Sequence, residues 1–190
     1  MARWAPGARE RLVVAAVELF AEQGYDATTV TEIAERAGVT KSTFFRHFPD
    51  KRELLSAGQE MLSRLLAEGI AAAPPAASPL TAIASGLQRA GEAFGPMSRE
   101  IGPQMRAAIS SSTELQEREA LKRIGLSVAM SSALVERGVA EPVAHLAAEM
   151  GVLAFKQGYA AWVGSEEDGT GFGAYAVAAL DALREASAAL

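Results

Sequence analysis

Residues 28–55 have the sequence TTVTEIAERAGVTKSTFFRHFPDKRELL, which predicts two short helices joined by a tight turn and the start of a third helix. The first helix begins at a capping box, Thr29-x-x-Glu32, whose hydroxyl and carboxylate satisfy free amides at the helix start. Gly38 ends this helix because glycine adopts the left-handed backbone that a sharp turn needs, and Thr40 or Ser42 can cap the next helix. The buried face of the first helix is formed by residues at helical spacing, Val30, Ile33, Ala34 and Ala37.

The second helix is predicted from Lys41 to Phe48, where Pro49-Asp50 stops it. Phe44 and Phe48 are four residues apart, so they share one face and can anchor the helix to a core. A helix, a glycine turn and a short helix with a polar face form a helix-turn-helix, whose second helix lies in the major groove of DNA. The remaining side chains are left to point outward: Lys41, Ser42, Thr43, Phe45, Arg46 and His47.

Positive charge is concentrated around this second helix. Between residues 36 and 52 there are five basic side chains and one acid, a local charge of +4 in a chain whose net charge is −5. Such a patch suits a phosphate backbone, and the alternative is a solvated helix face on an ordinary helical bundle. The basic residues of the patch are Arg36, Lys41, Arg46, Lys51 and Arg52.

From Ala8 to Leu55 the sequence resembles the DNA-binding domain of the TetR family of bacterial transcriptional regulators. The segment AGVTKSTFFRHFPDKREL, residues 37–54, is similar to the family's turn, recognition helix and start of its fourth helix. One departure is Phe45, because the family commonly has a tyrosine there whose hydroxyl meets a phosphate. Phe45 keeps the ring without the hydroxyl, so its contact with DNA would be apolar, with a thymine methyl or a sugar, or absent.

We therefore expect a double-stranded DNA operator as a partner. In a helix-turn-helix, residues at the start of the second helix contact base edges. Lys41, Ser42 and Thr43 are therefore predicted to contact bases. Thr29, Thr31, His47 and Lys51 are predicted to contact phosphates, and Arg46 could contact a base or a phosphate. A basic N-terminal arm, Arg3, Trp4 and Arg9, either reaches the minor groove or is a disordered tail. The full predicted DNA-binding set is Thr29, Thr31, Thr40, Lys41, Ser42, Thr43, Phe45, Arg46, His47 and Lys51.

The rest of the chain also has helical patterns, and no strand pattern of any length occurs in it. The predicted fold is all-α, with a helix-turn-helix domain over residues 1–50 and a helical effector-binding and dimerisation domain over residues 51–190. Asp50-x-x-Glu53, a second capping box, opens a long helix, and prolines mark a link near residues 74–79. Other helices are predicted over residues 8–22, 80–94, 98–110, 113–137, 142–163 and 172–188.

Small residues form a stripe along the last two helices at alternating steps of four and three. Such a seam lets helix backbones approach closely. It can pack within one subunit, but TetR-like proteins pair through their last two long helices, so the resemblance favours a homodimer interface. The predicted interface residues are Ala147, Gly151, Ala154, Gly158, Ala161, Phe172, Ala176, Ala179 and Leu183.

The resemblance also implies a pocket for a small-molecule effector among the middle helices. Methionine and aromatic side chains suit a plastic apolar cavity, although such residues are also ordinary core. The sequence does not identify the ligand. The candidate pocket residues are Phe94, Met97, Met105, Met130, Met150, Phe155 and Tyr159.

Enzymatic and metal chemistry receive little support. No phosphate-binding loop, nucleophile elbow or H-E-x-x-H motif occurs, so we expect no catalytic residue and no cofactor. Glu141, His145 and Glu149 share a helix face, but no second set of ligands accompanies them, so we expect no metal. The chain has no cysteine, no signal-peptide core and no membrane-spanning segment, which fits the cytoplasm.

The predicted function is a homodimeric transcriptional repressor that a small apolar or amphipathic ligand releases from a near-palindromic operator. One alternative is a regulator or activator that binds DNA without responding to a ligand. Another is a helical enzyme that has retained a helix-turn-helix, against which the lack of a convergent catalytic set counts.

Overall fold

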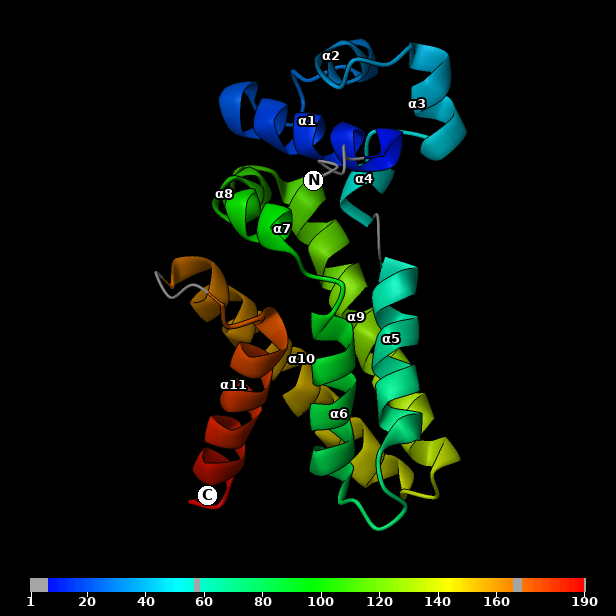
Figure 1. Ribbon diagram of the computed structural model, residues 1–190, viewed down its shortest axis with the longest axis vertical. Helices are drawn as coiled ribbons and strands as arrows, with labels where there is room; N and C mark the ends of the chain where they lie inside the picture. Colours follow the sequence, from blue (N-terminus) through cyan, green and yellow to red (C-terminus); the bar gives the residue numbers. More distant parts are fainter. Residues whose placement is uncertain (1–6, 57–58, 166–168, 190) are drawn as a thin grey trace. The chain divides into compact units, whose positions relative to one another are not determined.

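The computed structural model describes residues 7–56, 59–165 and 169–189, and all regular secondary structure in these ranges is α-helical (Figure 1). The predicted all-α fold is confirmed. The chain divides into two compact units, residues 1–57 with 101–121 and residues 58–100 with 122–190. These units differ from the predicted division at residue 50, because residues 101–121 return to the N-terminal unit.

The first unit contains the helix-turn-helix and one later piece of chain, residues 101–121. Its core is built around Phe20, Ile33 and Phe44, which are fully buried, and Ala108 and Leu115 from the later piece complete it. The sequence could not assign these two residues to this core, because they lie far along the chain. The helices are α1 (Ala8–Gln23), α2 (Val30–Arg36), α3 (Lys41–His47), α4 (Glu53–Ser56), α8 (Gly102–Ser111) and the first part of α9 (Thr113–Glu136).

The predicted caps and turn of the helix-turn-helix are confirmed. The Thr29 hydroxyl oxygen accepts from the Glu32 amide at 3.2 Å, and the Glu32 carboxylate accepts from the Thr29 amide at 2.8 Å. Gly38 has a φ of 67°, in the left-handed region that favours glycine. Thr40 caps α3 by accepting from the Thr43 amide at 3.1 Å. Local hydrogen bonds thus fix where α2 and α3 begin and how the chain turns between them.

The second predicted capping box is present only in half. Asp50 accepts from the amides of Arg52 and Glu53, at 2.8 and 3.1 Å. The Glu53 carboxylate instead accepts from Arg118 at 3.2 Å. The long helix predicted to follow is described as α4 and α5 (Gln59–Ala72), and residues 57–58 between them lie outside the described part.

The second unit has a single large core, with apolar residues of α5, α6, α9, α10 and α11. Ser78 caps α6 by accepting from the Thr81 amide at 3.2 Å, directly after the predicted proline link. Gly138, with φ 87°, ends α9, and Pro142 lies in the first turn of α10, as predicted. No described helix is long and apolar enough to span a membrane. The remaining helices are α6 (Pro79–Gly91), α7 (Pro96–Glu100), α10 (Glu141–Gly164) and α11 (Phe172–Ser187).

Most of the small-residue seam packs inside this unit, so six of its nine predicted interface residues are covered by their own chain. A Cβ atom on Gly158 would lie 2.5 Å from the Ala176 Cα, so α10 and α11 are in backbone contact there. A Cβ on Gly151 would meet Ile83 and Met130, each at 2.9 Å. Ala147, Gly151, Ala154, Gly158, Phe172 and Ala176 are buried by their own chain, whereas Ala161, Ala179 and Leu183 keep some exposed surface.

Candidate nucleic-acid interface

Helix α3 is anchored by the two phenylalanines that its spacing predicted. Phe44 is fully buried and Phe48 is nearly so, and their ring centroids are 5.9 Å apart. The Arg9 guanidinium lies over the Phe48 ring, 5.4 Å from its centroid. Because one face of α3 is fixed in this way, the opposite face is presented to solvent. That face exposes Lys41, Ser42, Phe45, Arg46 and His47.

Two of the threonines predicted to contact DNA, Thr29 and Thr40, cap helices, and Thr43 is hydrogen-bonded to one of these caps. The Thr29 hydroxyl donates to the Glu32 carboxylate at 2.7 Å while it accepts from the Glu32 amide. The hydroxyls of Thr40 and Thr43 lie 3.0 Å apart and form a hydrogen bond with each other. Their role in positioning α2 and α3 is therefore visible, and a DNA contact would have to be additional. Thr31 is exposed on α2.

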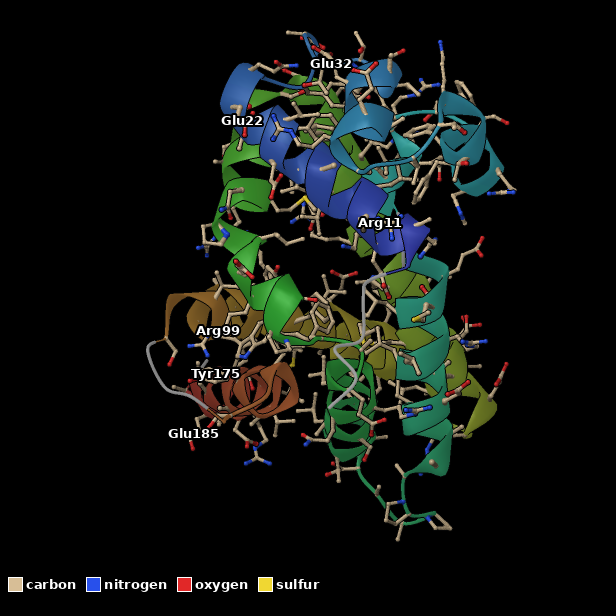
Figure 2. The ribbon with its side chains drawn as sticks, turned by 45° about the horizontal axis from the view of Figure 1, so that its top comes forward. Arg11, Glu22, Glu32, Arg99, Tyr175 and Glu185 are labelled. Carbon is tan, nitrogen blue, oxygen red and sulfur yellow. The ribbon has the colours of Figure 1, made fainter. Side chains whose placement is uncertain are left out.

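Most of the predicted basic patch is engaged inside the unit. Arg36 donates to both carboxylate oxygens of Glu22, at 3.0 and 2.8 Å, and contacts Glu18 at 3.5 Å. The hydrogen bond from Arg36 lowers the pKa of Glu22 from its ordinary value. Arg52 pairs with Asp50 at 2.7 Å and approaches Glu114 at 3.8 Å. Figure 2 shows Glu22 on α1 and Glu32 on α2.

Lys51 is placed differently from its predicted contact with a phosphate. Its ammonium donates to three backbone carbonyls of the turn before α2: Tyr25 at 2.7 Å, Thr28 at 3.1 Å and Asp26 at 3.4 Å. It also lies 4.1 Å from the centroid of the Tyr25 ring. All three N–H donors are thus directed at the protein, so Lys51 braces the turn that leads into the helix-turn-helix.

Two cations of the patch remain available. Among the described residues, no carboxylate lies within ion-pair distance of Lys41 or Arg46, and both side chains are exposed on α3. The local charge over residues 36–52 is +4, but three of the five basic side chains there contact carboxylates or carbonyls. The positive charge that an incoming polyanion meets is therefore focused on α3 itself.

Sequence reasoning missed Tyr25 and Glu114. The Tyr25 hydroxyl donates to Glu114 Oε1 at 3.2 Å, and the Tyr25 side chain is almost fully buried against Phe20, with ring centroids 5.0 Å apart. Burial, together with the Glu114 charge, raises the pKa of Tyr25 well above its ordinary range. No local pattern could have revealed this contact, since its partners lie 89 residues apart in the chain.

The candidate pocket residues are only partly brought together. Phe94, Phe155 and Tyr159 meet in an aromatic cluster, which Trp162 and Phe172 complete, with contacting ring centroids 4.5 to 6.1 Å apart. Phe94, Phe155 and Tyr159 are half-buried, whereas Trp162 and Phe172 are buried. Phe172, which the spacing of small residues places in the seam, is fully buried in this cluster.

Three of the four candidate methionines have described side chains. Met130 is fully buried against Gly151, and Met150 is half-buried against the core of the second unit. Met105 belongs to the other compact unit, because α8 returns to the helix-turn-helix. The side chain of Met97 lies outside the described part. The pocket predicted from all seven residues therefore stays a prediction.

Hydrogen bonds surround the aromatic cluster. The Tyr159 hydroxyl donates to the Ser98 carbonyl at 3.1 Å, and the Trp162 indole donates to the Thr170 carbonyl at 3.2 Å. Arg99 on α7 donates to the Ser165 carbonyl, and the Tyr175 hydroxyl donates to the Ser165 hydroxyl at 2.7 Å. Figure 2 shows Arg99 and Tyr175 on this side of the second unit. These bonds tie α7 to the segment that joins α10 and α11.

The structure gives Glu149 a partner other than a metal. Its carboxylate accepts from the Ser127 hydroxyl at 2.5 Å, while His145 and Glu141 are exposed on α10. Within the described ranges, no group of three or more histidine, cysteine, aspartate and glutamate side chains could hold a metal ion.

The N-terminal part of the chain matches known regulators. Residues 12–57 match the family model for bacterial regulatory proteins of the tetR family. The regulator TcmR of Streptomyces glaucescens is 39% identical over 82 residues, which are 43% of this chain and 36% of TcmR. The transcriptional activator FasR of Mycolicibacterium smegmatis is 48% identical over 46 residues, 24% of this chain and 21% of FasR. The chain thus matches well under half the length of these relatives.

Solved structures resemble nearly the whole chain. The repressor FadR of Thermus thermophilus, in complex with lauroyl-CoA, is 22% identical, with a TM-score of 0.51 and 93% of each chain covered. FadR of Bacillus subtilis, in complex with stearoyl-CoA, is 21% identical, with a TM-score of 0.58 and coverage of 91% of this chain and 96% of that one. At these identities the likeness shows the fold.

Proposed function

We propose that the chain is a sequence-specific, DNA-binding transcriptional regulator, because its residues 12–57 match the TetR family of bacterial regulatory proteins. One observation carries the proposal: α3 is capped and anchored, and it presents Lys41 and Arg46 without carboxylate partners among the described residues. Two fixed, exposed cations on a helix-turn-helix suit the major groove of DNA.

The residues proposed to meet DNA fall into two groups. On α3, Lys41, Ser42 and Phe45 are exposed and face base edges, with Arg46 and His47 one turn further along. Thr31 on α2 is proposed to contact a phosphate, Thr29 and Thr40 act chiefly by capping their helices, and Thr43 is hydrogen-bonded to the Thr40 cap. Lys51 is proposed to position the turn before α2.

DNA binding is tested by selection from a pool of random duplexes at physiological salt, followed by footprinting of the enriched sequence. We expect a site with two-fold symmetry, because two recognition helices of a dimer meet successive major grooves. Lys41→Ala and Arg46→Ala should each weaken binding and reduce its salt dependence. Equal binding to all duplexes, with no sequence enriched, would refute the proposal.

We propose that dimerisation uses a face of α10 other than the small-residue seam. Val143, Leu146 and Leu153 lie on the side of α10 next to the small-residue seam, and their side chains are 49%, 63% and 42% exposed. On α9, Ile124 and Val128 are also largely exposed, within one turn of the Ser127–Glu149 hydrogen bond that joins the two helices. An apolar patch of this kind marks an interaction surface.

Sedimentation of two variants distinguishes the two faces. Leu146→Asp changes an exposed side chain, so the protein should stay folded but become monomeric and lose operator affinity. Gly158→Leu should instead destabilise the second unit, because a Cβ atom at position 158 would lie 2.5 Å from the Ala176 Cα. A dimeric Leu146→Asp protein would exclude this face of α10.

We propose that a small apolar or amphipathic ligand acts on the second unit and lowers operator affinity. Support comes from the half-buried rings of Phe94, Phe155 and Tyr159, and from the acyl-CoA complexes of two proteins with the same fold. Lauroyl-CoA and stearoyl-CoA are therefore the first probes for a thermal-shift screen. A ligand of the folded state raises the melting temperature, and a true effector also releases DNA in a gel-shift titration.

Activation of transcription is the second candidate, since one relative is a named activator. A reporter gene placed behind the selected operator distinguishes the two, because a repressor lowers expression and an activator raises it. A regulator that responds to no ligand would show operator binding without any melting-temperature shift in the screen. In each case a non-enzymatic, cytoplasmic DNA-binding role is proposed.

A further inference from the structure

The most conspicuous apolar group on α3 is Phe45. Its side chain is 50% exposed, although it lies between exposed polar and basic residues. The ring contacts the buried Phe44 edge-on, with centroids 5.4 Å apart and planes at 81°, so its position is fixed on one side. Lys41, one helical turn earlier, places its ammonium 6.0 Å from the Phe45 centroid.

An exposed phenyl ring on this surface would be buried if a binding partner offered it an apolar group. Burial of apolar surface is favourable, and none of the described protein covers the outer half of this ring. In the major groove of DNA the bases display hydrogen-bonding groups and one apolar group, the 5-methyl of thymine. Phenylalanine is among the side chains suited to contact that methyl.

Lys41 adds a requirement for the neighbouring base. A lysine ammonium reads guanine through its N7 and O6 acceptors. Four residues of α-helix rise about 6 Å, and base pairs stack about 3.4 Å apart. The base read by Lys41 therefore lies within about two base pairs of the base that Phe45 contacts.

We propose that Phe45 and Lys41 form a specificity pair, in which Phe45 reads the 5-methyl group of a thymine and Lys41 reads a guanine within two base pairs of it. This inference rests on the proposed function, because it needs a DNA operator. It adds the chemical identity of two bases in each half-site. In modified DNA the same methyl group is carried by 5-methylcytosine.

The test starts from the sequence enriched from a random duplex pool. Each thymine of a half-site is replaced in turn by deoxyuridine, which removes only the methyl group. For the wild-type protein we expect one position where this change weakens binding about fourfold, the effect of burying one methyl group. Changing both half-sites should weaken binding about fifteenfold. At the same position, 5-methylcytosine paired with guanine should bind about fourfold better than cytosine paired with guanine.

Variants connect this effect to the pair. Phe45→Ala should bind the thymine and deoxyuridine operators equally, whereas Phe45→Tyr keeps the ring and should keep the difference. Lys41→Ala should lose its sensitivity to 7-deazaguanine, which lacks the N7 acceptor, at one nearby guanine. Arg46→Ala is the matched control, since it should weaken both operators alike and leave their ratio unchanged. Thermal melting establishes that each variant is folded.

Two results would overturn the inference while the proposed function stands: no deoxyuridine position affects the wild-type protein, or Phe45→Ala remains as sensitive as the wild type. In the first case the ring packs against sugar or solvent, and in the second another side chain reads the methyl. Failure to enrich any sequence would refute the proposed function itself.

Discussion

Replacing Lys51 by methionine separates a bracing role from a DNA-contacting role. The methionine keeps an unbranched side chain over the Tyr25 ring but removes the ammonium that binds three carbonyls. We expect the protein to lose stability, because the Tyr25 and Thr28 carbonyls lose a charged donor in a partly buried site.

The expected loss follows from the two shorter contacts. Distances of 2.7 and 3.1 Å are those of well-formed hydrogen bonds, and the contact at 3.4 Å is too long to add much. Hydrogen bonds to charged groups each contribute about 1.5–3 kcal/mol. Because water can reach this site, we take the lower value for each, which gives about 3 kcal/mol. For a chain of this size that corresponds to a fall in melting temperature of about 6–12 °C.

Thermal melting and the salt dependence of operator binding are measured on the same protein. Lys41→Met is the matched control, since Lys41 is exposed and has no carboxylate partner among the described residues. The control should melt within about 1 °C of the wild type, and it should weaken operator binding by about 1–3 kcal/mol and relax specificity, because Lys41 is proposed to read a base. If Lys51→Met melts like the wild type and also reduces the salt slope by about one, Lys51 leaves the carbonyls for a phosphate and the bracing argument fails.

Three further outcomes are expected. Thr29→Ala should cost about 1 kcal/mol in urea unfolding, because it removes the cap of α2; no change would mean that another group satisfies the Glu32 amide. Gly158→Leu should destabilise the second unit by more than about 3 kcal/mol, since its side chain would overlap the Ala176 backbone; a wild-type melting curve would contradict the close approach. The pKa values of Glu22 and Glu32 are lowered by hydrogen bonds from Arg36 and Thr29, so the stability that they contribute is present above their unfolded pKa of about 4.3 and is lost as the pH falls through the folded values. Urea unfolding between about pH 3 and pH 7 should show this loss below about pH 4, and a smaller loss in Arg36→Gln.

The helix-turn-helix was predictable because its signals act over a few residues. Thr29, Gly38 and Thr40 each act on backbone within four positions, and the structure has each of them as predicted. The charge of the interface was less predictable, because ion pairing depends on residues distant in sequence. Glu22 and Glu114 neutralise arginines that the sequence shows only as a basic run.

The face of α10 that meets its own chain could not be predicted from spacing. Small residues run along one side of the helix and large apolar ones along the neighbouring side, and either pattern is compatible with a helix interface. The decisive observation is that Gly158 lies against Ala176, and Gly151 against Ile83 and Met130. The assignment of Met105 to the first unit could not be predicted for a related reason, since the return of residues 101–121 to that unit leaves no local pattern in the sequence.

That return has a consequence for the order of synthesis and for protein engineering. Ala108 and Leu115 complete the core beneath the helix-turn-helix, so the core is open on one side while the ribosome is still adding α5 to α7. The helix-turn-helix cannot reach full stability until α8 and the start of α9 have left the ribosome. For the same reason, a hybrid regulator joined after residue 57 would carry an uncovered apolar face. To exchange the whole first unit between two proteins, residues 101–121 must be transferred together with the N-terminal segment, and the hybrid therefore needs more than one junction.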